Sequence, residues 1–157
     1  MIANELERAV AAYLASQYGG SASGTNPIRI ELGDGILSIY LGEWNTSIQL
    51  PALIVSCDQT IQEVDSGNSH CTLNITLRVQ ADPGNDNPIP LEELGELSNV
   101  MYQSMLFKGI VHQINQHASD DLTCIAVYQQ SQSKTARERI VEHALVNTVY
   151  AANTNVR

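Results

Sequence analysis

The sequence predicts one α+β domain in which a mixed or mainly antiparallel β-sheet carries helices packed on one face. Two stretches with apolar residues at helical spacing, 2–18 and 91–106, are separated by several stretches that are typical of strands. Residues 71–81 alternate between apolar and polar side chains, which indicates an antiparallel strand packed on one side. Since 157 residues suit one core, we expect a single domain, 1–157.

The first half of the chain is expected to begin with an amphipathic helix at 2–18, which a glycine pair would end. The small, polar residues at 19–27 predict a flexible surface loop. Period-two alternation on either side of a glycine-rich turn predicts a hairpin at 28–41. The apolar segment that follows, 50–57, predicts a strand that begins at a proline.

The second half is expected to start with another hairpin, in which 61–64 pairs with the alternating strand across the turn residues 65–69. We then expect a helix at 91–106, a short helix near 110–114, and strands at 122–130 and 140–151. The predicted core joins one face of the alternating strand to the stripe of the second helix: Leu73, Ile75, Leu77 and Val79 against Leu94, Leu97 and Met101.

The charge balance excludes nucleic acid as an adhesive ligand. The formal charge is −9, with 17 acidic and 8 basic residues, whereas phosphate binding needs Lys and Arg gathered on one face. A negative surface would still let DNA pass without sticking. The longest apolar run, 9–15, is shorter than the roughly 20 residues of a membrane span, and no secretory signal precedes it, so we expect cytosolic synthesis and no membrane.

Motifs that would carry chemistry are weak in this sequence. Asp65-Ser66-Gly67 matches an aspartic-protease triplet but lacks its apolar flanks, so a hairpin turn is favoured. His112 and His117 are five residues apart, which rotates them away from one helical face. Three cysteines, Cys57, Cys71 and Cys124, lie in predicted strands and are interpreted as reduced core residues. We therefore expect no catalytic residues, no metal site and no cofactor.

Two charge blocks of opposite sign are candidates for contacts between subunits. Blocks of this kind are usually solvated faces, but an acidic patch that meets a basic patch of the next subunit would set partner and register in a ring. The candidate interface residues are Asp82, Asp86, Glu92, Glu93 and Glu96 on the acidic side, and Lys134, Arg137 and Arg139 on the basic side.

Taken in order, these elements resemble the tail-terminator, or tail-completion, proteins of long-tailed bacteriophages. The likeness lies in the N-terminal amphipathic helix, the segment 50–55, the alternating strand 70–81, the helix 91–106 and a last strand after an Arg-containing turn, 137–141. It covers most of the chain without a short diagnostic motif. The loop at 19–27 and the hairpin at 28–41 are longer than the family's minimal pattern.

The resemblance implies a homo-oligomer, a hexameric ring in the virion tail or neck. Such a ring caps the tail tube protein, stops its polymerisation and docks a neck or head-connector protein, while DNA passes through without specific binding. The alternatives are another neck or head-completion ring, a non-viral α+β module that binds a ligand or a protein, and a hydrolase whose residues converge only in the fold.

Overall fold

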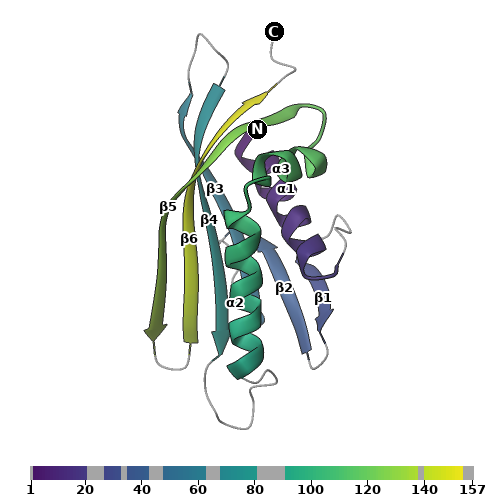
Figure 1. Cartoon of the computed structure of the whole chain (residues 1–157), viewed down its shortest axis with the longest axis vertical. Helices are drawn as coiled ribbons and strands as arrows, with labels where there is room; N and C mark the ends of the chain where they lie inside the picture. The colour runs from purple at the N-terminus through teal and green to yellow at the C-terminus, as the bar shows by residue number, and fades with distance from the viewer. Residues whose placement is uncertain are drawn as a thin grey trace.

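The chain forms one mixed sheet with helices on one of its faces (Figure 1). The computed structural model describes residues 2–20, 27–32, 35–42, 48–62, 68–80, 91–137 and 140–153, with the side chains of 59–62, 91–94, 137 and 153 left out. Its elements in order are α1 (Ile2–Gln17), β1 (Ile28–Leu32), β2 (Gly35–Leu41), β3 (Ala52–Gln62), β4 (Asn68–Gln80), α2 (Leu91–Leu106), α3 (Ile110–His117), β5 (Leu122–Arg137) and β6 (Ile140–Asn153). The predicted α+β class, with a mixed sheet and helices packed against it, is confirmed.

The helix α1 follows from its apolar stripe. Leu6, Val10 and Leu14 recur four residues apart and are fully buried, so this face of the helix packs against the sheet. The helix ends before Gly19, whose φ of 87° lies in the left-handed region that glycine adopts without steric cost. The loop predicted at 19–27 lies mostly outside the described residues.

The central strand β4 shows the predicted alternation without a break, because each side chain on one face is buried and each on the other is partly exposed. The buried apolar side chains include the predicted set of Leu73, Ile75, Leu77 and Val79. Leu97 and Met101 of α2 are also buried in the cluster that these residues form, whereas the side chain of Leu94 is not described. The predicted core therefore forms between sheet and helices.

The strands lie in the order β1-β2-β3-β4-β6-β5, and neighbours are antiparallel except β2 and β3. The sequence predicted separate strands at 50–57 and 61–64, and this was wrong. A single strand, β3, begins at Ala52 and continues to Gln62, because a bulge lets both parts pair with β4. Val64 lies outside the described residues.

The last hairpin is longer than predicted. The expected strand at 122–130 extends to Arg137 as β5, and the strand expected at 140–151 extends to Asn153 as β6. The added part of β5 is polar and lacks period-two alternation, so its sequence carries no pattern of burial. It is a strand because β6 pairs with it along its whole length.

The helices α2 and α3 cover the same face of the sheet as α1 (Figure 1). Ile110 and Ile114 of α3 are buried in the main core. A second, small cluster lies on the opposite face, where Tyr40 and Ile54 pack beneath Ile48. No helix in the part of the chain that the structure describes is long and apolar enough to cross a membrane.

Candidate assembly surface

Those of the predicted interface residues that the structure describes lie on two elements that share one end of the molecule. Asp82, Asp86 and Arg139 lie outside the described residues. The others are placed at the start of α2 (Glu92, Glu93 and Glu96) and towards the end of β5 (Lys134 and Arg137). The N-terminal end of α2 and the end of β5 lie together at the lower end of the molecule in Figure 1.

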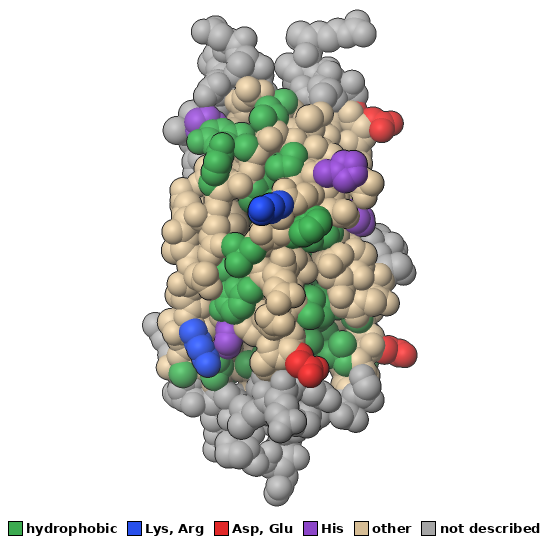
Figure 2. Space-filling view, in the orientation of Figure 1, with side chains coloured by type: hydrophobic (Ala, Val, Ile, Leu, Met, Phe, Trp, Pro, Cys, Tyr) green, Lys and Arg blue, Asp and Glu red, His purple; other side chains and the backbone are tan. Residues whose placement is uncertain are grey.

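Two of these residues have described side chains, Glu96 and Lys134, and both are exposed. Figure 2 shows a basic side chain over the lower part of β5 and β6 and an acidic side chain over the lower part of α2. Glu96 and Lys134 thus lie on different elements towards the same end of the molecule.

The edge of β5 is the least protected backbone of the sheet. β5 pairs with β6 on one side, and no strand among those described pairs with its other side. Natural edge strands are usually short, charged or interrupted by proline, which prevents pairing with other chains. β1 at the opposite edge fits this rule, with five residues that include Arg29 and Glu31. β5 has 16 residues without proline, and Lys134 is its one charge among the described side chains.

The upper end of the β5 edge is covered by a side chain. Asn115 of α3 donates from Nδ2 to the backbone oxygen of Cys124 at 2.9 Å, and its Oδ1 accepts from the backbone nitrogen of Cys124 at 2.7 Å. The amide therefore takes the place of a neighbouring strand at this point. It lies at a register shift between Cys124 and Ala126.

The lower half of β5 is exposed on both faces. Side chains alternate between the two faces of a strand, yet every side chain from 130 to 136 is exposed. After a second register shift, between Gln129 and Ser131, pairing with β6 is regular to the end of β5. This segment is held by backbone hydrogen bonds to β6 and by little side-chain packing, so it offers two faces and an edge to a partner.

A polar cluster beneath α2 connects this helix to β6. The Oγ of Ser98 lies 2.7 Å from Nδ1 of His143, and the hydroxyl of Tyr102 lies 3.2 Å from the same nitrogen. Burial, together with the positive charge of Lys134, lowers the pKa of His143. A neutral imidazole with its proton on Nε2 accepts the Ser98 hydroxyl at Nδ1, and this bond holds α2 in place on the sheet.

A serine beside a histidine also suggests a nucleophile and its base. Ser98 is buried, however, and it does not line the pocket between the three helices that is described below. We therefore interpret the contact between Ser98 and His143 as one that positions α2 on the sheet, and not as a nucleophile with its base. Sequence reasoning missed it, because Ser98 and His143 are 45 residues apart and no local motif marks either one.

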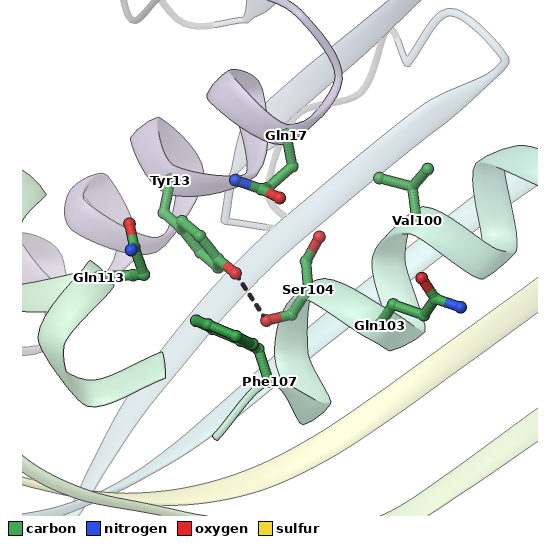
Figure 3. A pocket seen from close by; sticks show the side chains of 7 residues that line it. All are labelled: Tyr13, Gln17, Val100, Gln103, Ser104, Phe107 and Gln113. Atoms are coloured by element: carbon green, nitrogen blue, oxygen red, sulfur yellow. Dashed lines mark hydrogen bonds between the residues drawn. The ribbon is translucent and has the colours of Figure 1, made fainter. Parts of the chain in front are cut away.

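A pocket opens between the three helices (Figure 3). Its volume is about 440 Å³, and its lining comes from α1, α2, α3 and the turn between α2 and α3: Tyr13, Gln17, Val100, Gln103, Ser104, Phe107 and Gln113. The Tyr13 hydroxyl donates to the backbone oxygen of Ser104 at 2.8 Å. Phe107 and its neighbour Leu106 are each about half exposed, and none of the lining side chains carries a charge.

A row of aromatic rings crosses the opposite face of the sheet. The rings of Tyr128 and Tyr150 lie 5.7 Å apart and those of Tyr150 and His70 lie 4.3 Å apart, both in edge-on geometry. Tyr128, on β5, is 58% exposed, the largest value among the exposed large hydrophobic side chains described. Tyrosine combines a large apolar ring with a polar end and is enriched at protein interfaces.

The remaining candidates for chemistry are buried thiols. Cys57, Cys71 and Cys124 are free and buried. Burial raises the pKa of Cys124 to about 12, and a hydrogen bond with Cys71, together with burial, raises the pKa of Cys57. Within the described residues, no group of three or more His, Cys, Asp or Glu side chains is arranged to hold a metal ion.

The geometry thus contains an unprotected strand edge, a helix-side pocket and an aromatic row. The signals for these features are weak in the sequence: Leu106 and Phe107 stand at the end of a helical stripe, before Lys108 and Gly109, and Tyr128 is an aromatic residue at the start of a polar stretch. Comparison with known proteins finds no match to a protein-family model and no match to a curated protein.

Proposed function

We propose that this chain is a structural subunit of a bacteriophage virion, a tail terminator that forms a ring on the end of the tail tube. The observation that carries the proposal is the β5 edge, which is long, contains no proline and is exposed on both faces at 130–136. An edge of this kind is a template for association with another chain. The order of elements along the sequence, which resembles that of tail terminators, supplies the class of assembly.

A ring requires that two different surfaces of the same subunit meet. The two edges of the sheet differ in length and charge, and the face with the helices differs from the face without them. When one of these surfaces binds a different surface on the next copy, the contact is head-to-tail. Head-to-tail contacts close into a ring when the rotation between neighbours divides a full turn. Six subunits is the number that the resemblance implies.

The two ends of such a ring are different, and this difference is the mechanism. One end matches the tail tube protein and stops its polymerisation, and the other offers a docking surface to a neck or head-connector protein. DNA passes through the hole, and the net charge of −9 on each copy disfavours adhesion to phosphates. No step in this function needs a catalytic residue or a cofactor.

The proposal is tested by the mass of the purified protein and by loss of its gene. We expect light scattering to give a cyclic oligomer, and we expect a phage that lacks the gene to make tail tubes of unregulated length that do not join heads. Tails of normal, fixed length and firmly attached heads in the deletion mutant would exclude this role. Tails of normal length beside heads that lose their DNA would instead indicate a neck or head-completion ring.

The helix-side pocket favours a second candidate from another class. A volume of about 440 Å³ is within the range of small-molecule sites, roughly 300 to 1,000 Å³. A non-viral module that binds a small ligand or a peptide there would work as a monomer or a dimer. A monomeric mass at high protein concentration, with a small molecule retained through purification, would favour it over the ring.

A further inference from the structure

On the basis of the proposed ring, we infer that β5 of one copy docks along α2 of the next copy, with Tyr128 entering the pocket between the helices. The contact joins an edge of the sheet to the helix face of its neighbour. It is therefore head-to-tail, as the ring requires. The pocket, the aromatic side chain and the two charge blocks each support it independently.

The pocket suits an uncharged aromatic side chain with a polar end. The ring of Phe107 provides an apolar wall, and Figure 3 shows it below Tyr13 and Ser104, with side chains from α1, α2 and α3 around the cavity. The carboxamides of Gln17, Gln103 and Gln113 supply donors and acceptors for a phenol hydroxyl. A charged side chain would find no partner of opposite sign among the lining residues.

Among the side chains that the structure describes, Tyr128 fits this description best. It lies on the edge strand, is 58% exposed, and its ring is steadied by edge-on contact with Tyr150, so little conformational entropy is lost on docking. Phe107 and Leu106 at the pocket are about half exposed. The contact would cover these large apolar groups together, and buried aromatic anchors of this kind dominate interface energies.

The spacing of the charge blocks matches the same contact. Tyr128 and Lys134 pair with Thr148 and His143, which are five residues apart on β6, or about 17 Å of extended strand. From Phe107 back to Glu96 is eleven residues, almost all helical, or about 16 Å. The flexible side chains of Lys134 and Glu96 can span the remaining few ångströms.

The directions of the two elements agree as well. In Figure 1, β5 runs towards the end of the molecule at which α2 begins. A rotation about an axis parallel to the long axis keeps each element at its height, so it can bring the lower end of β5, which carries Lys134, to the start of α2, which carries Glu96. Tyr128 and Lys134 lie on opposite faces of β5, because their partners Thr148 and His143 are five residues apart on β6, so a helix contacts both only when it lies along the edge of the strand. The ion pair sets the register, and the aromatic contact supplies most of the affinity.

Cysteine cross-linking tests the contact directly. The chain with Tyr128→Cys and Gln103→Cys together, treated with a short bis-maleimide, should give a ladder of covalent oligomers on a denaturing gel. The native cysteines are buried and should not react in the folded protein. Each single variant should stay uncrosslinked. The matched control pair, Ile36→Cys with Gln103→Cys, should also stay uncrosslinked, since Ile36 is equally exposed but lies on β2.

A charge reversal provides the second measurement. Lys134→Glu should raise the dissociation constant of the contact by up to about fivefold, the range of exposed ion pairs. Adding Glu96→Lys to the same chain should restore it, and Arg29→Glu, at the other edge of the sheet, should have no effect. Tyr128→Ser, which changes an exposed side chain and should preserve the circular dichroism spectrum, should weaken the oligomer most.

The outcomes separate this contact from the ring itself. A ring of unchanged mass in Tyr128→Ser, with no cross-link in the double-cysteine chain, would overturn the docking of β5 on α2 and leave the ring in place. Cross-linking of Tyr128→Cys alone would indicate that two β5 strands meet across a twofold axis, which overturns it too. A protein that stays monomeric at high concentration would exclude both the contact and the ring.

Discussion

His143 is the titratable group that most directly affects how α2 rests on the sheet. Its Nδ1 lies within hydrogen-bonding distance of both Ser98 and Tyr102, and Lys134 is its cross-strand neighbour on β5. A protonated ring would need a second acceptor and would stand beside a lysine. The hydrogen bonds of this cluster therefore favour the neutral imidazole, and protonation of His143 should weaken the contact between α2 and the sheet.

The stability of the protein should fall as the pH drops through the titration of His143. The pKa of His143 is lowered in the folded state, first by burial and then by Lys134, so below its ordinary value of 6.5 the unfolded chain binds the proton more readily. The contribution of the neutral ring is thus complete above pH 6.5 and is lost as the pH falls below it. Urea unfolding between about pH 7.5 and about pH 5 measures this loss.

The comparison that isolates His143 uses His143→Gln, which keeps a polar side chain at the same place and does not titrate. The carboxylates contribute equally to both proteins, so the difference between the two pH profiles belongs to the histidine. We expect the variant to lose less stability than the parent between neutral and mildly acidic pH. Profiles of the same slope would show that the Ser98 contact does not depend on the charge of the ring.

At the scale of elements, Asn115 connects α3 to the start of β5. Both polar groups of its amide bond to the backbone of Cys124, at the register shift where the strand has no neighbouring strand on that side. The edge is thereby covered where β5 enters the core and uncovered along 130–136. One strand combines a fixed end with an exposed arm, which suits a hairpin that docks on another subunit.

Replacing Asn115 should therefore destabilise the fold and the hairpin together. Asn115→Ala leaves a backbone donor and acceptor of the buried Cys124 without their partner, a loss of about 1 to 3 kcal/mol in the free energy of unfolding. Urea denaturation provides the value. The matched control, Gln116→Ala, removes an exposed side chain of the same helix, and we expect little change. Equal midpoints for both variants would contradict the role of the amide.

For the whole molecule, charge is the property that would govern an encounter with DNA. Each copy adds a net charge of −9, and the eight basic residues include Arg78, which is paired with Glu142 at 2.7 Å. A ring would multiply the negative field, which extends about a Debye length, roughly 8 to 10 Å at ordinary salt. Passage of DNA without adhesion is compatible with such a surface.

The purified protein should accordingly fail to bind duplex DNA. Titration of labelled duplex at low salt is the most demanding condition, since electrostatic binding is strongest there. We expect no change in fluorescence anisotropy at protein concentrations that give complete oligomer. Tight binding that weakens steeply with added salt would reveal a basic lining, and would assign Lys134, Arg137 and Arg139 to a DNA-facing surface in place of an interface.

The sequence by itself determined the parts of this protein whose burial is periodic. The alternation around Ile75 predicted β4 and its buried face, and the stripe through Leu6, Val10 and Leu14 predicted α1. Both predictions were possible because each pattern shows locally which side chains are buried in the fold. The α+β class followed from the order of those patterns.

Only the tertiary structure decided which strand became an exposed edge and which distant residues meet. The polar stretch 130–136 is a strand because β6 lies beside it, and nothing in its own sequence records that pairing. The parallel pairing of β2 with β3 and the contact between Ser98 and His143 depend likewise on chain segments brought together from far apart. The local periodicity of a sequence reflects which side chains are buried. Which strands become neighbours in a sheet depends instead on the free energy of the whole fold, so the exposed edge and the pocket can be identified only in the folded chain.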